Sequence, residues 1–223
     1  KPLALTVSEL DDIRAFFENR TLPTPILQTG FNRRFSPYAR RIHQWVHRRT
    51  NPMILNYRMN AGYLPLDHWV HTTEGGGRNL GEACHIYDLF TFLTGSRVMD
   101  IQAYNIAPAT QYYSARDNFA AVIKFEDGSV ATLTYTALGS TEYPKEQMEI
   151  FVDGRVIVLD DYKRLAVVGS KGKGIESTVV DKGHREELEA FGHSIQQGGT
   201  WAIPLWEQIQ ATEIALRVEA QLR

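Results

Sequence analysis

The chain has 223 residues, of which 43% are hydrophobic and 22% are charged, and its formal net charge is −2. The apolar content and the low net charge exclude intrinsic disorder, and the balanced charge argues against binding to nucleic acid. No apolar run approaches the ~18 residues that a membrane-spanning helix needs. The single cysteine, Cys84, has no partner for an internal disulfide, so we expect a reducing, cytoplasmic location.

The first fifty residues have the pattern of the end of an α/β unit. Thr6 and Glu9 fit a capping box, and the apolar positions that follow predict a helix through about Arg20. Residues 26–31 are typical of a short strand. Residues 36–50, with a proline at the first helical position, predict a second helix.

The next segment has a different character. Residues 53–61 alternate in polarity, which predicts a strand with one wet or ligand-bearing face. That face carries three polar side chains: Asn56, Arg58 and Asn60. Residues 62–81 form a long loop, of a length typical of lids and binding loops. Residues 82–93 then predict an apolar helix that Gly95 ends.

The second half of the chain is dominated by strands. Turns at 127–128 and 153–154 contain Asp-Gly, which predicts tight hairpins. The expected strands are 98–106, 119–125, 130–137, 147–152 and 155–160, with weaker ones at 165–168 and 176–180. Helices at 185–196 and 204–222 follow. This order predicts an α+β fold, with an open, mostly antiparallel sheet and helices packed on one face. The other face is expected to be wet or packed against another subunit.

The stretch from Glu74 to Asp88 is the richest in candidate chemistry. A glycine-rich loop before a helix offers free backbone N–H groups to an anion, and the alternative is a tight turn that sets the helix entry. Glu82, His85 and Asp88 share one helix face, where His85 between two carboxylates is a candidate general base. The alternatives are half of a metal site and a hydrogen-bonded structural histidine. Because the chain has no second Glu-x-x-His, we expect no metal.

Other charged residues have simpler interpretations. Arg33 and Arg34 follow the first predicted strand and are candidates for anion binding, with solvated side chains as the alternative. Four histidines occupy surface-like helix positions and are expected to be solvated: His43, His47, His184 and His193.

Several segments together resemble the Gfo/Idh/MocA family of NAD(P)-dependent oxidoreductases. The matching stretches are 1–4, 30–37, 75–88, and 183–191 followed by Pro204. The resemblance implies a Rossmann domain followed by an α+β domain similar to the C-terminal domain of dihydrodipicolinate reductase. The family's Glu-Lys-Pro motif closes the Rossmann domain, and this chain starts at that lysine. Residues 1–31 are then expected to be the remnant of the dinucleotide-binding Rossmann domain, and residues 32–223 the substrate-binding and oligomerisation domain.

The resemblance also implies roles for single residues. Lys1 matches the lysine that lies close to the nicotinamide and the substrate, and His85 matches the histidine that acts on the substrate hydroxyl. Gly81 stands where many members have an aspartate, so Glu82 beside it is the candidate substitute. The cofactor is NAD or NADP, with its main site expected ahead of this chain. The expected cofactor contacts within the chain are Lys1, Pro2 and Arg33.

A polar, hydroxylated ligand would be held by residues of the strand, the loop and the helix. We expect substrate contacts from Arg58, Asn60, Tyr63, Trp69 and Asp88. Arg58 suits a phosphate or a carboxylate, because its guanidinium can donate two parallel hydrogen bonds. Ordinary roles in the sheet and the loop remain the alternative for the strand and loop residues.

The leading hypothesis is the substrate-binding half of an NAD(P)-dependent dehydrogenase that acts on CH–OH groups. The substrate would be a small sugar, nucleotide sugar or polyol, and the chain alone is expected to be inactive. We expect a homodimer or homotetramer that forms through the sheet face. One alternative is a non-catalytic carbohydrate-binding or dimerisation module. Another is a metal-assisted hydrolase that uses Glu82, His85 and Asp88.

Overall fold

The computed structural model describes residues 1–20, 24–198 and 201–222. In this part of the chain, eight strands form one sheet in the order β2-β3-β4-β1-β5-β6-β7-β8. Strands β1 and β4 run parallel, and the other neighbours are antiparallel. The strands are β1 (Ile54–Asn60), β2 (Val98–Asn105), β3 (Phe119–Phe125), β4 (Val130–Thr136), β5 (Glu146–Val152), β6 (Arg155–Asp160), β7 (Arg164–Val168) and β8 (Ile175–Glu176).

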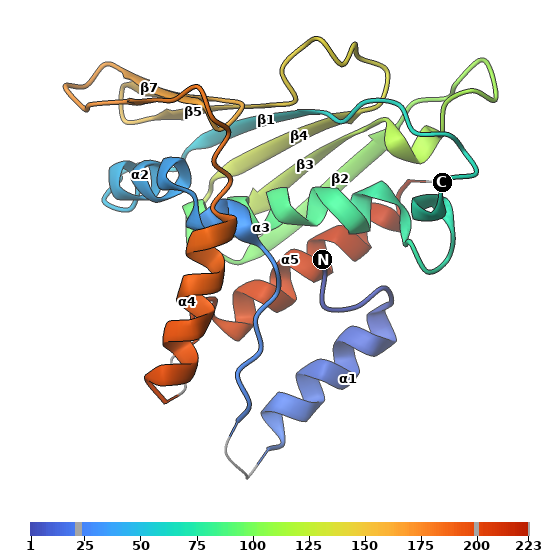
Figure 1. Cartoon of the computed structure of the whole chain (residues 1–223), viewed down its shortest axis with the longest axis horizontal. Coiled ribbons are helices and arrows are strands. Elements are labelled where there is room, and N and C mark those ends of the chain that lie inside the picture. The colour runs from blue at the N-terminus through green and yellow to red at the C-terminus, as the bar shows by residue number, and fades with distance from the viewer. Residues whose placement is uncertain (21–23, 199–200, 223) are drawn as a thin grey trace.

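The helices lie on one side of the sheet, as Figure 1 shows. They are α1 (Val7–Glu18), α2 (Pro37–Val46), α3 (Cys84–Thr94), α4 (His184–Gln196) and α5 (Leu205–Glu219). Helix α3 lies directly beneath the sheet and packs against α5, whereas α1 lies farthest from the sheet. None of the helices in the described ranges is long and apolar enough to cross a membrane. The predicted α+β fold with helices on one face is confirmed.

Side chains that alternate between buried and outward-facing positions along the strands create the core. In β3, four side chains on one face are buried: Phe119, Ala121, Ile123 and Phe125. The residues between them face outward, and Val122 is exposed. Because successive side chains of a strand point to opposite faces, the same pattern in β1, β4 and β5 gives the sheet one buried face and one open face.

The open face of the sheet carries a row of apolar side chains. Pairing aligns Val130 with Ile54, Ile54 with Phe151, Phe151 with Val156, and Val156 with Val168. Three of them are clearly exposed: Ile54, Phe151 and Val168. We refer to these five side chains as the apolar row; it crosses five neighbouring strands.

Several local predictions are confirmed. Thr6 and Glu9 form the capping box of α1. Ser36 caps α2 by accepting a hydrogen bond from the backbone of Ala39, although this helix ends at Val46 rather than near residue 50. Gly95 ends α3 in the left-handed conformation, with φ of 63°.

The predicted strand at 26–31 is wrong. This segment is extended, but no described strand pairs with it, and its polar groups bond to helices instead. The backbone N–H of Thr29 donates to Gln208 Oε1 at 2.8 Å, and Gln28 Nε2 donates to the carbonyl of Glu187 at 3.2 Å. A strand exists only where a neighbour completes its hydrogen bonds, and sequence pattern alone does not supply that neighbour.

Two boundaries also differ from expectation. Strand β8 covers only Ile175–Glu176, where a longer strand at 176–180 was predicted. The helical path into α3 starts earlier than expected, because a π-helical turn at Asn79–Ala83 precedes it. The long loop after β1 therefore ends near Arg78 and contains a short 3₁₀ turn at Trp69–His71.

Candidate active site

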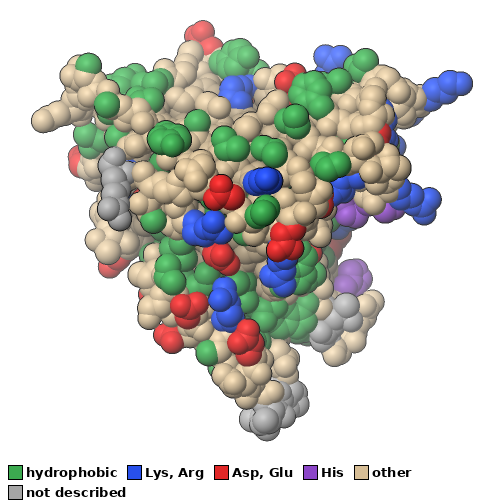
Figure 2. Space-filling view, turned by 180° about the vertical axis from the view of Figure 1, so that it is seen from behind, with side chains coloured by type: hydrophobic (Ala, Val, Ile, Leu, Met, Phe, Trp, Pro, Cys, Tyr) green, Lys and Arg blue, Asp and Glu red, His purple; other side chains and the backbone are tan. Residues whose placement is uncertain are grey.

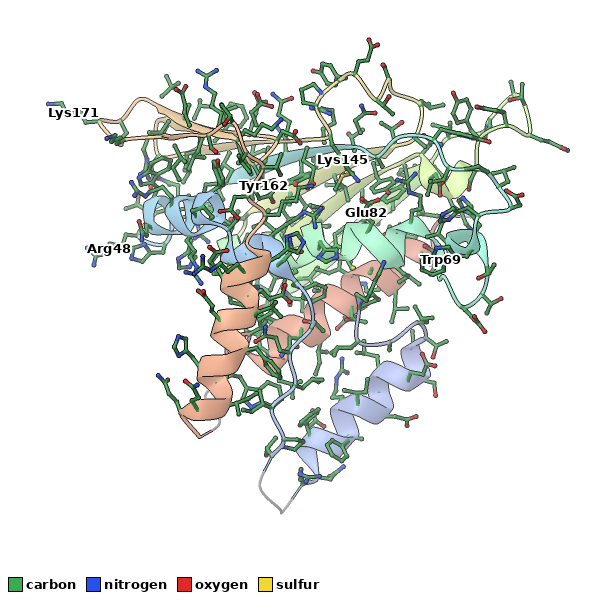
Figure 3. All side chains as sticks on the ribbon, in the orientation of Figure 1. Arg48, Trp69, Glu82, Lys145, Tyr162 and Lys171 are labelled. Carbon is green, nitrogen blue, oxygen red and sulfur yellow. The ribbon has the colours of Figure 1, made fainter. Side chains whose placement is uncertain are left out.

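A pocket of about 590 Å³ lies at the point where the start of the chain meets the entry to α3. Its walls come from the loop after β1, the π-helical turn and single residues of other segments: Lys1, Gly30, Asn32, Arg33, Lys145, Lys182 and His184. Of the residues predicted from the sequence, five line it: Lys1, Arg33, Trp69, Glu82 and His85. Figure 3 shows Glu82 and Lys145 between the sheet and α3, with Trp69 beyond the N-terminal end of that helix.

Lys1 is held at the pocket wall by a backbone carbonyl. Its Nζ donates to the oxygen of Gly81 at 2.7 Å. A Cβ added at Gly81 would lie 3.4 Å from that Nζ, so a side chain at this position would directly face the ammonium. Among the described residues, no carboxylate forms an ion pair with Lys1, which leaves its charge uncompensated within the pocket.

His85 presents a neutral imidazole to the pocket. Its ring meets Phe31 edge-on, with centroids 5.7 Å apart. Burial lowers the pKa of His85 well below its usual value of 6.5, and the positive charges of Arg33 and Lys1 lower it further. Its Nδ1 is buried and has no hydrogen-bond partner among the described groups. An uncharged imidazole that lines a pocket is suited to accept a proton from a ligand.

Glu82 is fully engaged with its neighbours. It accepts hydrogen bonds from Lys145 Nζ at 2.7 Å, from Arg78 Nη2 at 3.2 Å and from the hydroxyl of Tyr135. Burial opposes its ionisation, but Lys145, Tyr135 and Arg78 outweigh burial and lower the pKa of Glu82 to about 2. A carboxylate this acidic is a poor base, so the geometry favours Glu82 as a group that positions Lys145.

Glu146 holds the opposite wall in the same way. Its fully buried carboxylate accepts two hydrogen bonds from Arg33, at 2.8 and 3.0 Å, one from Lys182 at 2.5 Å and one from the hydroxyl of Tyr57. Burial opposes its ionisation, and the two cations overcome this and lower the pKa of Glu146 to about 2. Arg33 is thus committed to Glu146 and is not free to bind a cofactor on its own.

Two predicted substrate contacts lie outside this pocket. Asp88 is fully buried and paired with Arg34, whose two nitrogens donate to it at 2.6 and 2.9 Å. Arg58 points to the open face of the sheet, where it donates to the carbonyl of Pro144 at 2.7 Å and lies over the ring of Tyr143. The structure does not bring these two residues to the pocket, because helical and strand spacing give the face of a single element but not what covers that face.

Three further predicted residues lie beside the pocket rather than in it. Asn60 lines an adjoining hollow of about 400 Å³, where its Nδ2 donates to the carbonyl of Ser140 at 2.7 Å. Tyr63 stacks on Tyr112 with ring centroids 4.3 Å apart. Pro2 borders a separate groove beside α1.

The glycine triplet has a structural role. A Cβ at Gly75 would lie 2.3 Å from the carbonyl oxygen of Trp69 and 2.6 Å from Val70 Cα, so only glycine allows this approach. Gly76 and Gly77 have φ of 71° and 81°, which favours glycine. The triplet is not part of the pocket wall, and the tight-turn interpretation holds. This turn places Trp69, 58% exposed, at the edge of the pocket.

The pocket wall also contains charged and titratable residues that the sequence did not indicate as site residues, among them Arg78, Lys145, Lys182 and His184. His184 is exposed, as expected, and it also begins α4 at the pocket wall. Two signals were present in the sequence. Arg78 lies four residues before Glu82, a spacing that pairs side chains on a helix, and Lys182 directly precedes the Gly183-His184 stretch.

Glu82 and Asp88, the two carboxylates of the alternative metal site, bind different partners. Glu82 binds Lys145 and Arg78, whereas Asp88 binds Arg34 in the core. The described residues contain no group of three or more His, Cys, Asp and Glu side chains that are close enough to share a metal ion. The arrangement therefore gives no support to metal-assisted hydrolysis.

Comparison with known proteins agrees with this fold. The family model of the GFO/IDH/MocA C-terminal domain matches residues 51–174, more than half of the chain. The chain is 23% identical over 202 residues to the uncharacterized oxidoreductase YrbE of Bacillus subtilis (strain 168), covering 88% of this chain and 57% of that protein. The chain thus spans little more than half the length of this relative.

Two solved structures share the fold. UDP-N-acetylglucosamine 3-dehydrogenase GnnA from Acidithiobacillus ferrooxidans superimposes with a TM-score of 0.77 at 22% identity, over all of this chain and 70% of that one. GenD2 from gentamicin A biosynthesis, solved in complex with NAD, gives a TM-score of 0.74 at 14% identity, over all of this chain and 68% of that one. By its sequence match and its fold, the chain belongs to the Gfo/Idh/MocA family of oxidoreductases.

Proposed function

We propose that this chain is the substrate-binding half of an NAD(P)-dependent dehydrogenase. The enzyme transfers hydride between a hydroxyl-bearing carbon of a sugar, nucleotide sugar or polyol and a nicotinamide. The observation that carries the proposal is His85, a neutral imidazole with an unpartnered nitrogen, which shares a pocket with the uncompensated ammonium of Lys1. The dehydrogenase relatives support the reaction type.

His85 and Lys1 have different roles in the oxidation. The imidazole of His85 removes the proton of the substrate hydroxyl, and the ammonium of Lys1 stabilises the negative charge that develops on that oxygen. The nicotinamide, when bound, takes the hydride from the same carbon. Trp69, exposed at the pocket edge, offers an apolar surface for the face of a sugar ring.

The cofactor proposal concerns mainly a part of the protein outside this chain. Residues 1–31 are proposed as the last part of a dinucleotide-binding domain, and residues 32–223 as the substrate domain. NAD or NADP would bind chiefly to the preceding domain, with Lys1 reaching the nicotinamide. GenD2, a structural neighbour solved with NAD, supports this proposal. The intact mass of the native polypeptide tests it, because a native chain that starts at Lys1 has no room for that domain.

The function is tested by His85→Ala in the full-length enzyme, assayed with a panel of sugars, nucleotide sugars and polyols. We expect kcat to fall by at least ~100-fold, the typical contribution of a general base. The matched control is His193→Ala on α4, an exposed histidine that does not line the pocket. A variant that folds normally and keeps its rate would contradict the role of His85.

The alternative function is a non-catalytic carbohydrate-binding or dimerisation module of the same fold. Gly81 favours it, because many family members carry an aspartate at this position. Such a module would bind its ligand with or without a nicotinamide cofactor and would show no hydride transfer in the full-length protein.

We also propose that a second copy of the chain covers the open face of the sheet. The apolar row supports this proposal, since a stripe of exposed apolar side chains is costly to leave in water. A homodimer or homotetramer built through this face would leave the pocket accessible, because the pocket is lined by the entry to α3, and Glu82 there lies on the helix side of the sheet (Figure 3).

A further inference from the structure

The pocket is flanked by two clusters of the same composition. Each cluster contains one buried or half-buried glutamate that binds one arginine, one lysine and one tyrosine hydroxyl. The first consists of Glu82 with Arg78, Lys145 and Tyr135, and the second of Glu146 with Arg33, Lys182 and Tyr57. All four cations line the pocket.

The second cluster keeps one uncompensated positive charge, because Glu146 alone faces both Arg33 and Lys182. In the first cluster Asp117 also lies 4.0 Å from Arg78, so its charges are nearly balanced. Both glutamates have a pKa of about 2, so neither loses its charge at working pH. The arginines are buried behind their carboxylates, whereas the side chains of Lys145 and Lys182 are 40% and 20% exposed. The two lysines are therefore the cations of these clusters that a ligand in the pocket can reach.

Lys1 adds a third positive charge, and Glu82 is the only carboxylate among the described residues that line the pocket. On the side of the molecule seen from behind, by contrast, acidic and basic side chains are interspersed (Figure 2). A cleft lined by one sign of charge concentrates ligands of the opposite sign, because its low-dielectric walls focus the field.

We propose that the pocket selects substrates that carry an oxyanion, such as a phosphate, diphosphate or carboxylate, and that Lys145 and Lys182 bind this group. The inference rests on the proposed function and narrows its substrate class to charged sugars and their nucleotide derivatives. A neutral polyol would leave the Lys1 ammonium and the excess positive charge of the Glu146 cluster without a counter-charge. An oxyanion instead forms charge-assisted hydrogen bonds with the lysines, while the buried glutamates hold both in place.

The test is binding calorimetry on this chain with matched ligand pairs. The pairs are UDP-N-acetylglucosamine with N-acetylglucosamine, and glucuronate with glucose, and pyrophosphate serves as the simplest probe. We expect the anionic member of each pair to bind more tightly. Lys145→Met and Lys182→Met should each weaken its binding by about tenfold, the loss of one charge-assisted hydrogen bond. Lys124→Met on the open face of the sheet is the matched control and should change nothing.

Thermal unfolding of each lysine variant confirms that it folds, and Lys145→Arg should retain most of the binding because it keeps the charge. Equal affinity for neutral and anionic ligands, or unchanged pyrophosphate binding in both methionine variants, would overturn the proposal. The proposal is also overturned if the binding of NAD depends on these lysines while the anionic sugars do not bind.

Turnover of the full-length enzyme separates this inference from the proposed function. Oxidation of neutral polyols with a KM that Lys145→Met leaves unchanged would reject the charged substrate class and keep the dehydrogenase. Lysine-dependent anion binding without any hydride transfer would reject the dehydrogenase and keep the anion site.

Discussion

Glu146→Gln is predicted to destabilise the chain by about 3 kcal/mol at pH 7. The substitution keeps the shape of the side chain but removes the charge that Arg33 and Lys182 face in a buried site. Those cations lower the pKa of Glu146 from its ordinary 4.5 to about 2. Each pKa unit corresponds to about 1.36 kcal/mol, so this shift corresponds to about 3 kcal/mol of folding free energy. The value agrees with the ~3–5 kcal/mol that breaking a buried ion pair costs.

The destabilisation by Glu146→Gln is predicted to become smaller as the pH falls. The pKa is lower in the folded chain, so the stabilisation is present above the unfolded value and is lost as the pH falls toward 2. At pH 3 the unfolded chain already holds the proton, and the difference between Glu146→Gln and the parent chain should shrink to about 1 kcal/mol. Other acidic groups titrate in both proteins and cancel in the difference.

Urea unfolding at pH 7 and pH 3 measures both values, provided that the slope of the transition is unchanged. The matched control is Glu149→Gln, on the same strand but on its open face, and we expect a change within about 0.5 kcal/mol. A penalty for Glu146→Gln that is the same at both pH values would refute the reasoning, since it would show that the cost is not electrostatic.

Other predictions concern the backbone and the surface. Gly75→Ala should lower the melting temperature, because the added Cβ would lie 2.3 Å from the carbonyl oxygen of Trp69. Gly192→Ala in α4, where an added Cβ meets nothing within 4 Å, should instead raise the free energy of unfolding by up to about 1 kcal/mol. Thr6→Ala removes the N-cap of α1 and should cost about 1 kcal/mol in denaturant unfolding; an unchanged midpoint would contradict the cap. Phe151→Glu should convert the proposed oligomer to monomer in light scattering, and an unchanged mass would place the interface elsewhere.

The sequence determined the elements with a local cause. The capping box of α1, the proline start of α2, the hairpins at Asp-Gly and the left-handed Gly95 all follow from neighbours within a few residues. The resemblance to a known family also placed Lys1 and His85, and the structure brings both to one pocket.

The tertiary structure alone decided what each side chain meets. Residues 26–31 have the composition of a strand but lack a neighbour to pair with, and Asp88 has the spacing of an active-site carboxylate but is paired with Arg34. Lys145 and Lys182 are far from His85 in sequence, and they reach its pocket only because Glu82 and Glu146 hold them there. Spacing along one element predicts which side chains share a face, whereas the pairing of charges between distant elements depends on how those elements pack.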